Sequence, residues 1–233
     1  PVDAWGLDVL STSSNKALEI PPGLSILSVS PRAWEIIEAK KEHAHRGWYY
    51  NLSVWKAYRD GAARMSWRTA QKPDAPIPAP ATTTMATGLI AALRTSLKRI
   101  LHQETLAGHW ARYAWAQQVT RQGMRNLGFE PLVAEEAASF TVTTVRKRDD
   151  MESDEELREF LLNKYGFFVS GAGGVLAGNV LRIGHMGKAS TPEYLLPFLL
   201  AVEDFVRTVK EVETPVGAGL VGLEHHPILA HLR

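Results

Sequence analysis

The hydrophobic pattern of the amino-terminal part predicts short extended elements before any helix. Residues 7–14 and 23–30 are short runs rich in apolar and β-forming residues, which favours two strands, the first of them buried. The letters PPG between the runs do not continue a helix, so a loop follows the first strand. Pro31 suits the first turn of a helix over 31–45. This part therefore predicts strand, loop, strand and helix.

The middle of the chain loses this pattern and then becomes helical. Residues 47–80 combine an aromatic patch with a dense run of prolines within 71–80, which we interpret as a long functional loop. Apolar residues at helical spacing return at 82–108, and the helical pattern continues until Gly128 closes it. We expect the chain to cross into a second domain near residue 102.

Strands and helices alternate in the carboxy-terminal part. Ser153 and Glu156 form a capping-box pattern, and Thr191 precedes a proline that suits a first helical position. The pattern predicts a small α/β sandwich. Residues from Thr214 onward lack periodicity and are expected to form a surface extension. The predicted elements are a strand at 139–148, a helix at 153–166, strands at 167–174 and 179–187, and a helix at 191–212.

Composition narrows the classes of partner. The chain carries 26 Lys and Arg against 25 Asp and Glu, so no strong field draws it to nucleic acid or to an anionic membrane. The absence of cysteine excludes disulfides, thiolate metal sites and a cysteine nucleophile, and it fits a reducing compartment such as the cytoplasm. No apolar run approaches the roughly 20 residues of a membrane span. No carboxylate spacing completes a metal site around the histidines.

Lys16 is the first candidate for chemistry. It lies between the end of a predicted strand and the rigid PPG turn, which places an amine at the sheet edge where ligands of open α/β folds usually bind. Spacing alone is a weak argument, because most lysines in such positions are only solvated.

Two separated motifs strengthen the argument. The string WGLDVLSTSSNKALEIPPGLSILSVSPRAWE at 5–35 resembles the cofactor-lysine segment of the class V aminotransferases, in particular the alanine-glyoxylate and serine-pyruvate group. The string NVLRIGHMG at 179–187 resembles the strand of that family whose arginine binds the substrate carboxylate. The order and distance of the motifs also fit, and the resemblance covers about residues 5–212.

The resemblance implies an α/β fold, the carboxy-terminal part of a fold-type I transferase that depends on pyridoxal 5'-phosphate. Residues 1–101 would be the end of the cofactor-binding large domain, 102–212 the small α/β sandwich domain, and 213–233 a tail. Lys16 would then bind the cofactor aldehyde and later move a proton between the substrate Cα and the cofactor C4′.

Three further site residues follow from the resemblance. Arg182 would hold the substrate α-carboxylate with its planar fork, whereas the residues alone favour a structural ion pair for an arginine in an apolar strand. Asn15 would donate to the cofactor phosphate. Thr84 from the neighbouring subunit of a homodimer would reach the same phosphate, with Thr82 and Thr83 as rivals and a helix cap as the other interpretation of the threonines.

The implied activity is transfer of an amino group from alanine or serine to a 2-oxo acid such as glyoxylate or pyruvate. In the family, the aspartate that pairs with the pyridine nitrogen, the stacking aromatic ring and the phosphate loop precede the lysine segment. They are therefore expected in a longer polypeptide or a second chain. The alternatives are a catalytically incomplete fragment, an interaction subunit of that fold, and a related phosphonate transaminase or lyase.

Overall fold

A computed structural model describes residues 2–40, 47–63 and 83–223. The chain divides into two compact units. Unit 1 comprises Pro1–Asn15 and Ile20–Leu93, and unit 2 comprises Lys16–Glu19 and Arg94–Arg233. The short segment with Lys16 thus belongs to the carboxy-terminal unit. The division of roles expected at residue 102 stays a prediction.

Unit 1 contains a two-stranded antiparallel sheet. Strand β1 (Val9–Ser13) pairs with β2 (Ser25–Val29), so both predicted strands are present. Buried Ser14 closes the loop between them: its N–H donates to the Leu24 carbonyl at 3.1 Å and its Oγ donates to the Pro21 carbonyl at 2.9 Å. These bonds define where the segment with Lys16 leaves the sheet.

The prediction that the first strand is buried is wrong for the described part of the chain. All five residues of β1 are exposed, including Val9 at 53% and Leu10 at 41%. An apolar strand becomes buried only when neighbouring strands and covering helices remove it from water. The sheet of unit 1 has two strands among the described residues, so its apolar side chains stay open.

Two helices follow the sheet. Helix α1 (Pro31–Ala39) begins with the expected proline, and the Ser30 Oγ accepts from the Ala33 N–H at 3.0 Å as its cap. Residues 41–45 of the predicted helix lie outside the described residues. Helix α2 (Leu52–Ala63) corrects the prediction of an irregular segment over 47–80. The segment contains leucine, lysine, arginine and alanines, which favour a helix, and before it the Asn51 Oδ1 accepts from the Ser53 N–H at 3.0 Å.

The prediction of continuous helix from residue 82 into the next segment is also wrong. Helix α3 (Thr87–Lys98) runs into a π-helical turn, Arg99–Glu104, and α4 (Leu106–Asn126) begins anew. Thr105 breaks the path with a φ of 67°, and its Oγ1 accepts from the Gly108 N–H at 3.1 Å. Gly128 ends α4 as predicted, with a φ of 81°. The proline-rich residues 71–80 lie outside the described residues.

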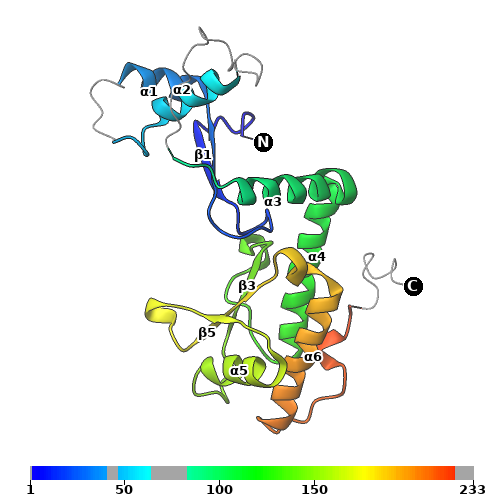
Figure 1. Ribbon diagram of the computed structural model, residues 1–233. Coiled ribbons are helices and arrows are strands. Elements are labelled where there is room, and N and C mark those ends of the chain that lie inside the picture. Colours follow the sequence, from blue (N-terminus) through cyan, green and yellow to red (C-terminus); the bar gives the residue numbers. More distant parts are fainter. Residues whose placement is uncertain (1, 41–46, 64–82, 224–233) are drawn as a thin grey trace. The chain divides into compact units, whose positions relative to one another are not determined.

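Unit 2 is built on a three-stranded antiparallel sheet in the order β3-β5-β4. Helices α4 and α6 pack against each other (Figure 1). The predicted alternation of strands and helices is present, although the strand predicted at 167–174 shortens to two residues. The elements are β3 (Val142–Arg146), α5 (Glu155–Phe160), a π-helical turn (Leu161–Tyr165), β4 (Ser170–Gly171), β5 (Val180–Gly184) and α6 (Pro192–Thr208).

The caps predicted for α5 and α6 occur with altered bonds. The Ser153 Oγ accepts from the Glu155 N–H at 3.1 Å, and the Ser153 N–H donates to Glu156 Oε1 at 3.4 Å. Thr191 is at the N-cap of α6, but its Oγ1 donates to the Lys188 carbonyl. Helix boundaries were thus predicted better than the bonds that make them.

The core of unit 2 lies between its sheet and its helices. Its largest fully buried side chains come from α4, the residues just after α4, the helices α5 and α6, and the strand β5. They include Trp115, Met124, Leu127, Phe129, Leu157, Leu181, Leu199 and Phe205. Burial of these apolar side chains stabilises unit 2.

Residues 214–223 lie partly at the surface, with Val216 79% and Val221 62% exposed, but they dock on unit 2 and do not extend from it. Glu203 on α6 is 3% exposed, and its carboxylate accepts from the N–H groups of Gly217 and Gly219 at 2.8 and 3.1 Å. Leu223 is 6% exposed and belongs to the core. A buried carboxylate needs such donors, so it fixes the segment on α4 and α6. Residues 224–233 lie outside the described residues.

Candidate active site

The four predicted site residues are exposed, and they are divided between the units. Lys16 and Arg182 belong to unit 2, while Asn15 and Thr84 belong to unit 1. Thr83 is also exposed, and Thr82 lies outside the described residues. Helix α3 begins at Thr87, so neither Thr83 nor Thr84 occupies its N-cap position.

Arg182 lies in the middle of β5, opposite Thr144 and Ser170. Its Nε donates to the Gly171 carbonyl at 2.7 Å. Within the described residues the guanidinium group forms no ion pair. The structural ion pair that the residues alone favoured is thus not seen among the described residues, and Arg182 is exposed.

Lys16 begins a tight turn. The Glu19 N–H donates to the Lys16 carbonyl at 2.9 Å, and the Ser96 Oγ donates to the Leu18 carbonyl at 2.6 Å. Glu19 has a φ of 61°, in the left-handed region that costs a non-glycine residue about 1–2 kcal/mol. Among the described residues the Lys16 amine forms no hydrogen bond or ion pair. The turn is thus held by its backbone and by Glu19, which leaves the amine accessible.

The carboxylate of Glu19 enters a cluster of charged side chains on unit 2. Arg112 Nη2 donates to Glu19 Oε1 at 2.8 Å, and the Tyr113 hydroxyl donates to the same oxygen at 3.1 Å. Arg99 pairs with the other oxygen. We call Glu19 and its neighbours the Arg112 cluster; its members are Glu19, Arg99, Glu104, His109, Arg112 and Tyr113.

A second carboxylate balances the charge of the Arg112 cluster. Arg112 Nε donates to Glu104 Oε1 at 2.5 Å, and His109 Nδ1 lies 3.0 Å from Glu104 Oε2. Burial alone would raise the pKa of Glu104, but the hydrogen bonds from Arg112 and His109 lower it to about 2. Burial would lower the pKa of Arg112, yet its bonds to both carboxylates raise it. Both groups therefore stay charged at neutral pH.

The same cluster reaches the segment that follows the Arg182 strand. Arg112 Nη1 donates to the Gly187 carbonyl at 2.7 Å and also bonds the Ser190 hydroxyl. The Gly187 N–H donates to the Tyr113 hydroxyl at 3.0 Å. Gly187 has a φ of 60°, and a Cβ there would lie 3.4 Å from the Glu19 Cγ. Two segments far apart in the sequence are thus joined through the start of α4.

The residues that carry these contacts were missed in the sequence. Glu19 stands between the lysine and the two prolines, and Arg112 lies in a long helical pattern. A glutamate in a tight loop could have signalled an anchoring role. No local pattern marks its partners, because they lie on another element about ninety positions away.

The donor groups present fit pyridoxal phosphate as far as they extend. An accessible amine, at Lys16, suits an aldehyde. The exposed amide of Asn15 and the hydroxyl of Thr84 suit phosphate oxygens, and the guanidinium of Arg182 suits a carboxylate. The chemistry of these groups agrees with the cofactor that the resemblance implied.

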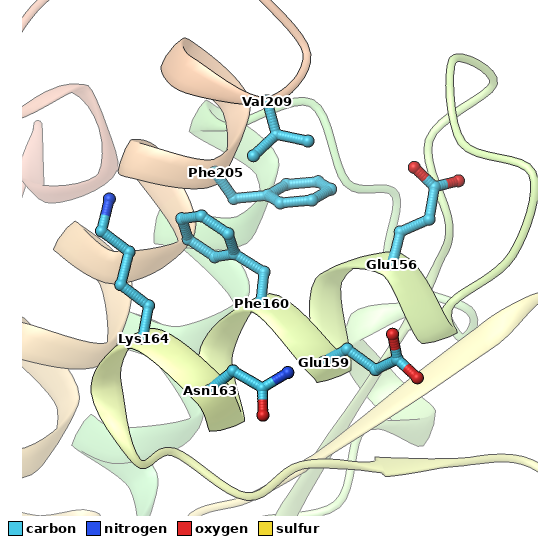
Figure 2. A pocket seen from close by; sticks show the side chains of 7 residues that line it. All are labelled: Glu156, Glu159, Phe160, Asn163, Lys164, Phe205 and Val209. Carbon is cyan, nitrogen blue, oxygen red and sulfur yellow. The ribbon is translucent and has the colours of Figure 1, made fainter.

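A separate depression on unit 2 does not take part. It lies between the α5 region and the end of α6, with the rings of Phe160 and Phe205 side by side at 5.4 Å between centroids (Figure 2). Lys164 pairs with Asp204 at 2.5 Å, and Glu156 pairs with Lys210. Neither Lys16 nor Arg182 lines it. Two of its charged side chains, Glu156 and Lys164, are already paired within the unit.

Within residues 2–40, 47–63 and 83–223, no group of three or more His, Asp or Glu could hold a metal ion. None of the helices described there has the length and apolar character required to cross a membrane.

Relatives cover almost the whole chain. No family model matches the sequence. An uncharacterized aminotransferase of Methanocaldococcus jannaschii is 33% identical over 90% of this chain, and serine-glyoxylate aminotransferase of Arabidopsis thaliana is 30% identical over 97%. A protein named soluble hydrogenase, small subunit, from Synechococcus sp. is 30% identical over 94%. The chain spans about half the length of each: 50%, 52% and 51% in that order.

Solved structures agree with this relationship. Alanine-glyoxylate aminotransferase from Nostoc sp. is 29% identical, with a TM-score of 0.72 over 88% of this chain and 50% of its own. Ureidoglycine-glyoxylate aminotransferase from Bacillus subtilis, at 24% identity, has the same fold, with a TM-score of 0.77 over 94% of this chain and 51% of its own. The chain therefore belongs to the class V aminotransferases, with the fold-type I architecture, and corresponds to about the carboxy-terminal half of its relatives.

Proposed function

We propose that the complete protein is a pyridoxal-phosphate-dependent aminotransferase that moves an amino group from a small amino acid, alanine or serine, to a 2-oxo acid such as glyoxylate or pyruvate. The accessible amine of Lys16, in a turn that follows a strand within the matched segment, carries the proposal. The names of the alanine-glyoxylate and serine-glyoxylate relatives support the substrate classes.

Lys16 has two tasks in this proposal. Its amine holds the cofactor aldehyde carbon, and once released it removes the proton from the substrate Cα and returns a proton during the exchange. When bound, the cofactor supplies the electron sink that makes this proton transfer possible. Exposure of Lys16 supports both tasks, because an amine engaged in an ion pair could not attack.

Arg182 binds and orients the substrate. Its Nε is fixed by the Gly171 carbonyl, which leaves the outer edge of the fork for two parallel hydrogen bonds to an α-carboxylate. Amino acid and 2-oxo acid both carry that carboxylate, so one residue serves both half-reactions.

The remaining assignments complete the proposed site. Asn15 donates to the cofactor phosphate, and Thr84 of a second subunit does so across a homodimer, with Thr82 and Thr83 as alternatives. Pyridoxal phosphate, small amino acids and 2-oxo acids are then the ligands, and the cytoplasm is the proposed compartment. Nucleic acid and membranes are not among the proposed partners.

The chain alone is not expected to be active. The groups that pair with the pyridine nitrogen, stack on the ring and cradle the phosphate would come from the other half of the protein. The exposed faces of β1 and β2 support this, because such a sheet needs neighbours. Activity and bound cofactor in residues 1–233 expressed alone would contradict it. A catalytically incomplete fragment, an interaction subunit, and a phosphonate transaminase or lyase are the alternatives.

Lys16→Ala in the complete protein tests the proposal. Loss of both the attachment point and the proton carrier should lower turnover by more than about a thousandfold. Lys40→Ala, at another exposed position, is the matched control and should leave turnover unchanged. The measurement is single-turnover transfer with alanine and glyoxylate, together with the melting temperature. Near-normal turnover of the Lys16 variant would end the assignment.

Arg182→Lys tests the carboxylate role. The charge remains but the fork is lost, so KM should rise for amino acid and 2-oxo acid alike, with a smaller fall in kcat. Arg146→Lys, at an exposed arginine of β3 in the same sheet, is the control. An unchanged KM for both substrates would mean that the carboxylate is held elsewhere.

A further inference from the structure

We propose that the carboxylate of Glu19, through Arg112 and Tyr113, is a positioning device that couples the Lys16 turn to the segment after the Arg182 strand. The inference rests on the proposed function for the meaning of Lys16 and Arg182. Its structural content, a link between two segments through the start of α4, stands on contacts within unit 2 alone.

The first step concerns the Lys16 turn. Its backbone contacts are one bond inside the turn and one from Ser96. Glu19 lies in a left-handed conformation that favours glycine. The side chain of Glu19 is 12% exposed and is held by two guanidinium groups and a hydroxyl. Charge-assisted bonds of this kind are stronger than neutral ones, so they offset the backbone strain and fix the turn.

The second step concerns the other segment. Residues Gly187–Ser190 form a short 3-10 turn after β5. Two of the three side chains that hold Glu19, those of Arg112 and Tyr113, also hold this turn. Arg112 donates to the Gly187 carbonyl and bonds Ser190, while the Tyr113 hydroxyl accepts from the Gly187 N–H. Each of the two α4 residues therefore contacts both segments.

The third step concerns how firmly the Arg112 side chain is held between the two segments. Arg112 Nε is occupied by Glu104, which His109 and Arg99 also bond. Because each nitrogen of its guanidinium group is hydrogen-bonded, Arg112 cannot move toward one segment without breaking a bond to the other segment or to Glu104. Tyr113 is 4% exposed, and burial raises the pKa of its hydroxyl. It therefore remains a donor to Glu19 at neutral pH.

This arrangement has a use in transamination. The amine must reach the same Cα whose carboxylate the arginine holds, and errors of about 1 Å can cost about a hundredfold in rate. Two exposed side chains on different segments keep a fixed relation only if their backbones are tied. The Arg112 cluster supplies that tie without contacting substrate, so its members are positioning residues.

The experiment uses amide hydrogen exchange on the complete protein, a readout that does not depend on turnover. Glu19→Gln keeps the shape of the side chain but removes its charge. Exchange should become about tenfold faster at 16–19 and also at 187–190, while kcat falls about tenfold or more. Glu135→Gln is the matched control: Glu135 bonds Arg121 and Arg125 on the same unit, away from both segments.

Glu19→Gly distinguishes the contribution of the backbone conformation from that of the carboxylate. Glycine suits the φ of this position, so a role limited to turn geometry predicts wild-type exchange or slower. Positioning by the carboxylate predicts faster exchange at both segments. Wild-type exchange in Glu19→Gly would overturn the proposal.

Two further outcomes decide the matter. Faster exchange throughout unit 2, in α5 as well, would show that Glu19 only stabilises the unit, and this would overturn the proposal.

Tyr113→Phe removes a single hydroxyl and retains the ring; about threefold faster exchange at both segments is expected, and no change at either would count against the coupling. If Lys16→Ala is inactive while Glu19→Gln changes neither amide exchange nor kcat, the proposed function is retained and the coupling is refuted.

Discussion

The two units differ in how far their apolar side chains are buried. In unit 2 the residues at core spacing are removed from water, and Leu199 is 0% exposed. In unit 1 comparable side chains remain open, and Leu10 in β1 is 41% exposed. Both units have apolar runs in their sequence, so such a run does not by itself decide burial. The number of neighbouring elements does: unit 2 packs helices of its own against its sheet, whereas among the described residues the strands of unit 1 have few neighbours.

The largest test of this difference is a pair of leucine truncations. Leu199→Ala should lower the free energy of unfolding by about 2–5 kcal/mol, because it leaves a cavity in a closed core. Leu10→Ala should cost less than about 1 kcal/mol in the 233-residue chain. Urea denaturation with and without each substitution measures both. Equal costs in the two units would contradict the comparison, and a larger cost for Leu10→Ala in the complete protein would show that its face is covered there.

The closed core of unit 2 also predicts a pH dependence of stability that arises from burial of a histidine. His185 is 0% exposed, and Thr143 Oγ1 lies 2.9 Å from its Nε2. Burial lowers its pKa from 6.5 to about 4. Because the unfolded chain binds the proton more readily, stability is complete above pH 6.5 and is lost as the pH falls toward 4, on the order of 3 kcal/mol.

The control for this prediction is His185→Gln, which keeps a polar side chain and cannot titrate. Its unfolding free energy should change little between pH 6.5 and 5, where the wild type declines. Glu104 contributes in a lower window: its lowered pKa means that its stabilisation is lost as the pH falls from 4.5 toward 2. A wild-type profile that is flat from pH 6.5 to 4 would refute the role of His185.

The smallest effect concerns two helical glycines. In α4 a Cβ at Gly123 would lie 2.6 Å from Leu199 Cδ1 and 2.7 Å from the Gly219 carbonyl oxygen, whereas at Gly88 in α3 it would meet nothing within 4 Å. Gly123→Ala should destabilise by about 1–3 kcal/mol through overpacking. Gly88→Ala should stabilise by up to about 1 kcal/mol, because alanine favours a helix. Thermal unfolding measures both, and the same sign in both variants would contradict the difference in packing.

Sequence by itself determined the order of most strands and helices, apart from α2 and the break at Thr105, and it determined the loop with Lys16, the strand with Arg182 and the family. These features depend on residues close together in the chain: a period of two or near four, a PPG turn, and a proline at the start of a helix. The role of each site residue was implied by the resemblance and stays a prediction.

Only the tertiary structure decided which residues meet. Nothing near Glu19 in the sequence indicates Arg112, and nothing near Glu203 indicates that Gly217 and Gly219 would dock on it. The break at Thr105 was equally hidden. Charged and polar groups are satisfied by whatever donors packing brings near them. Such partners depend on the whole fold, whereas a strand or a turn depends mainly on its own few residues.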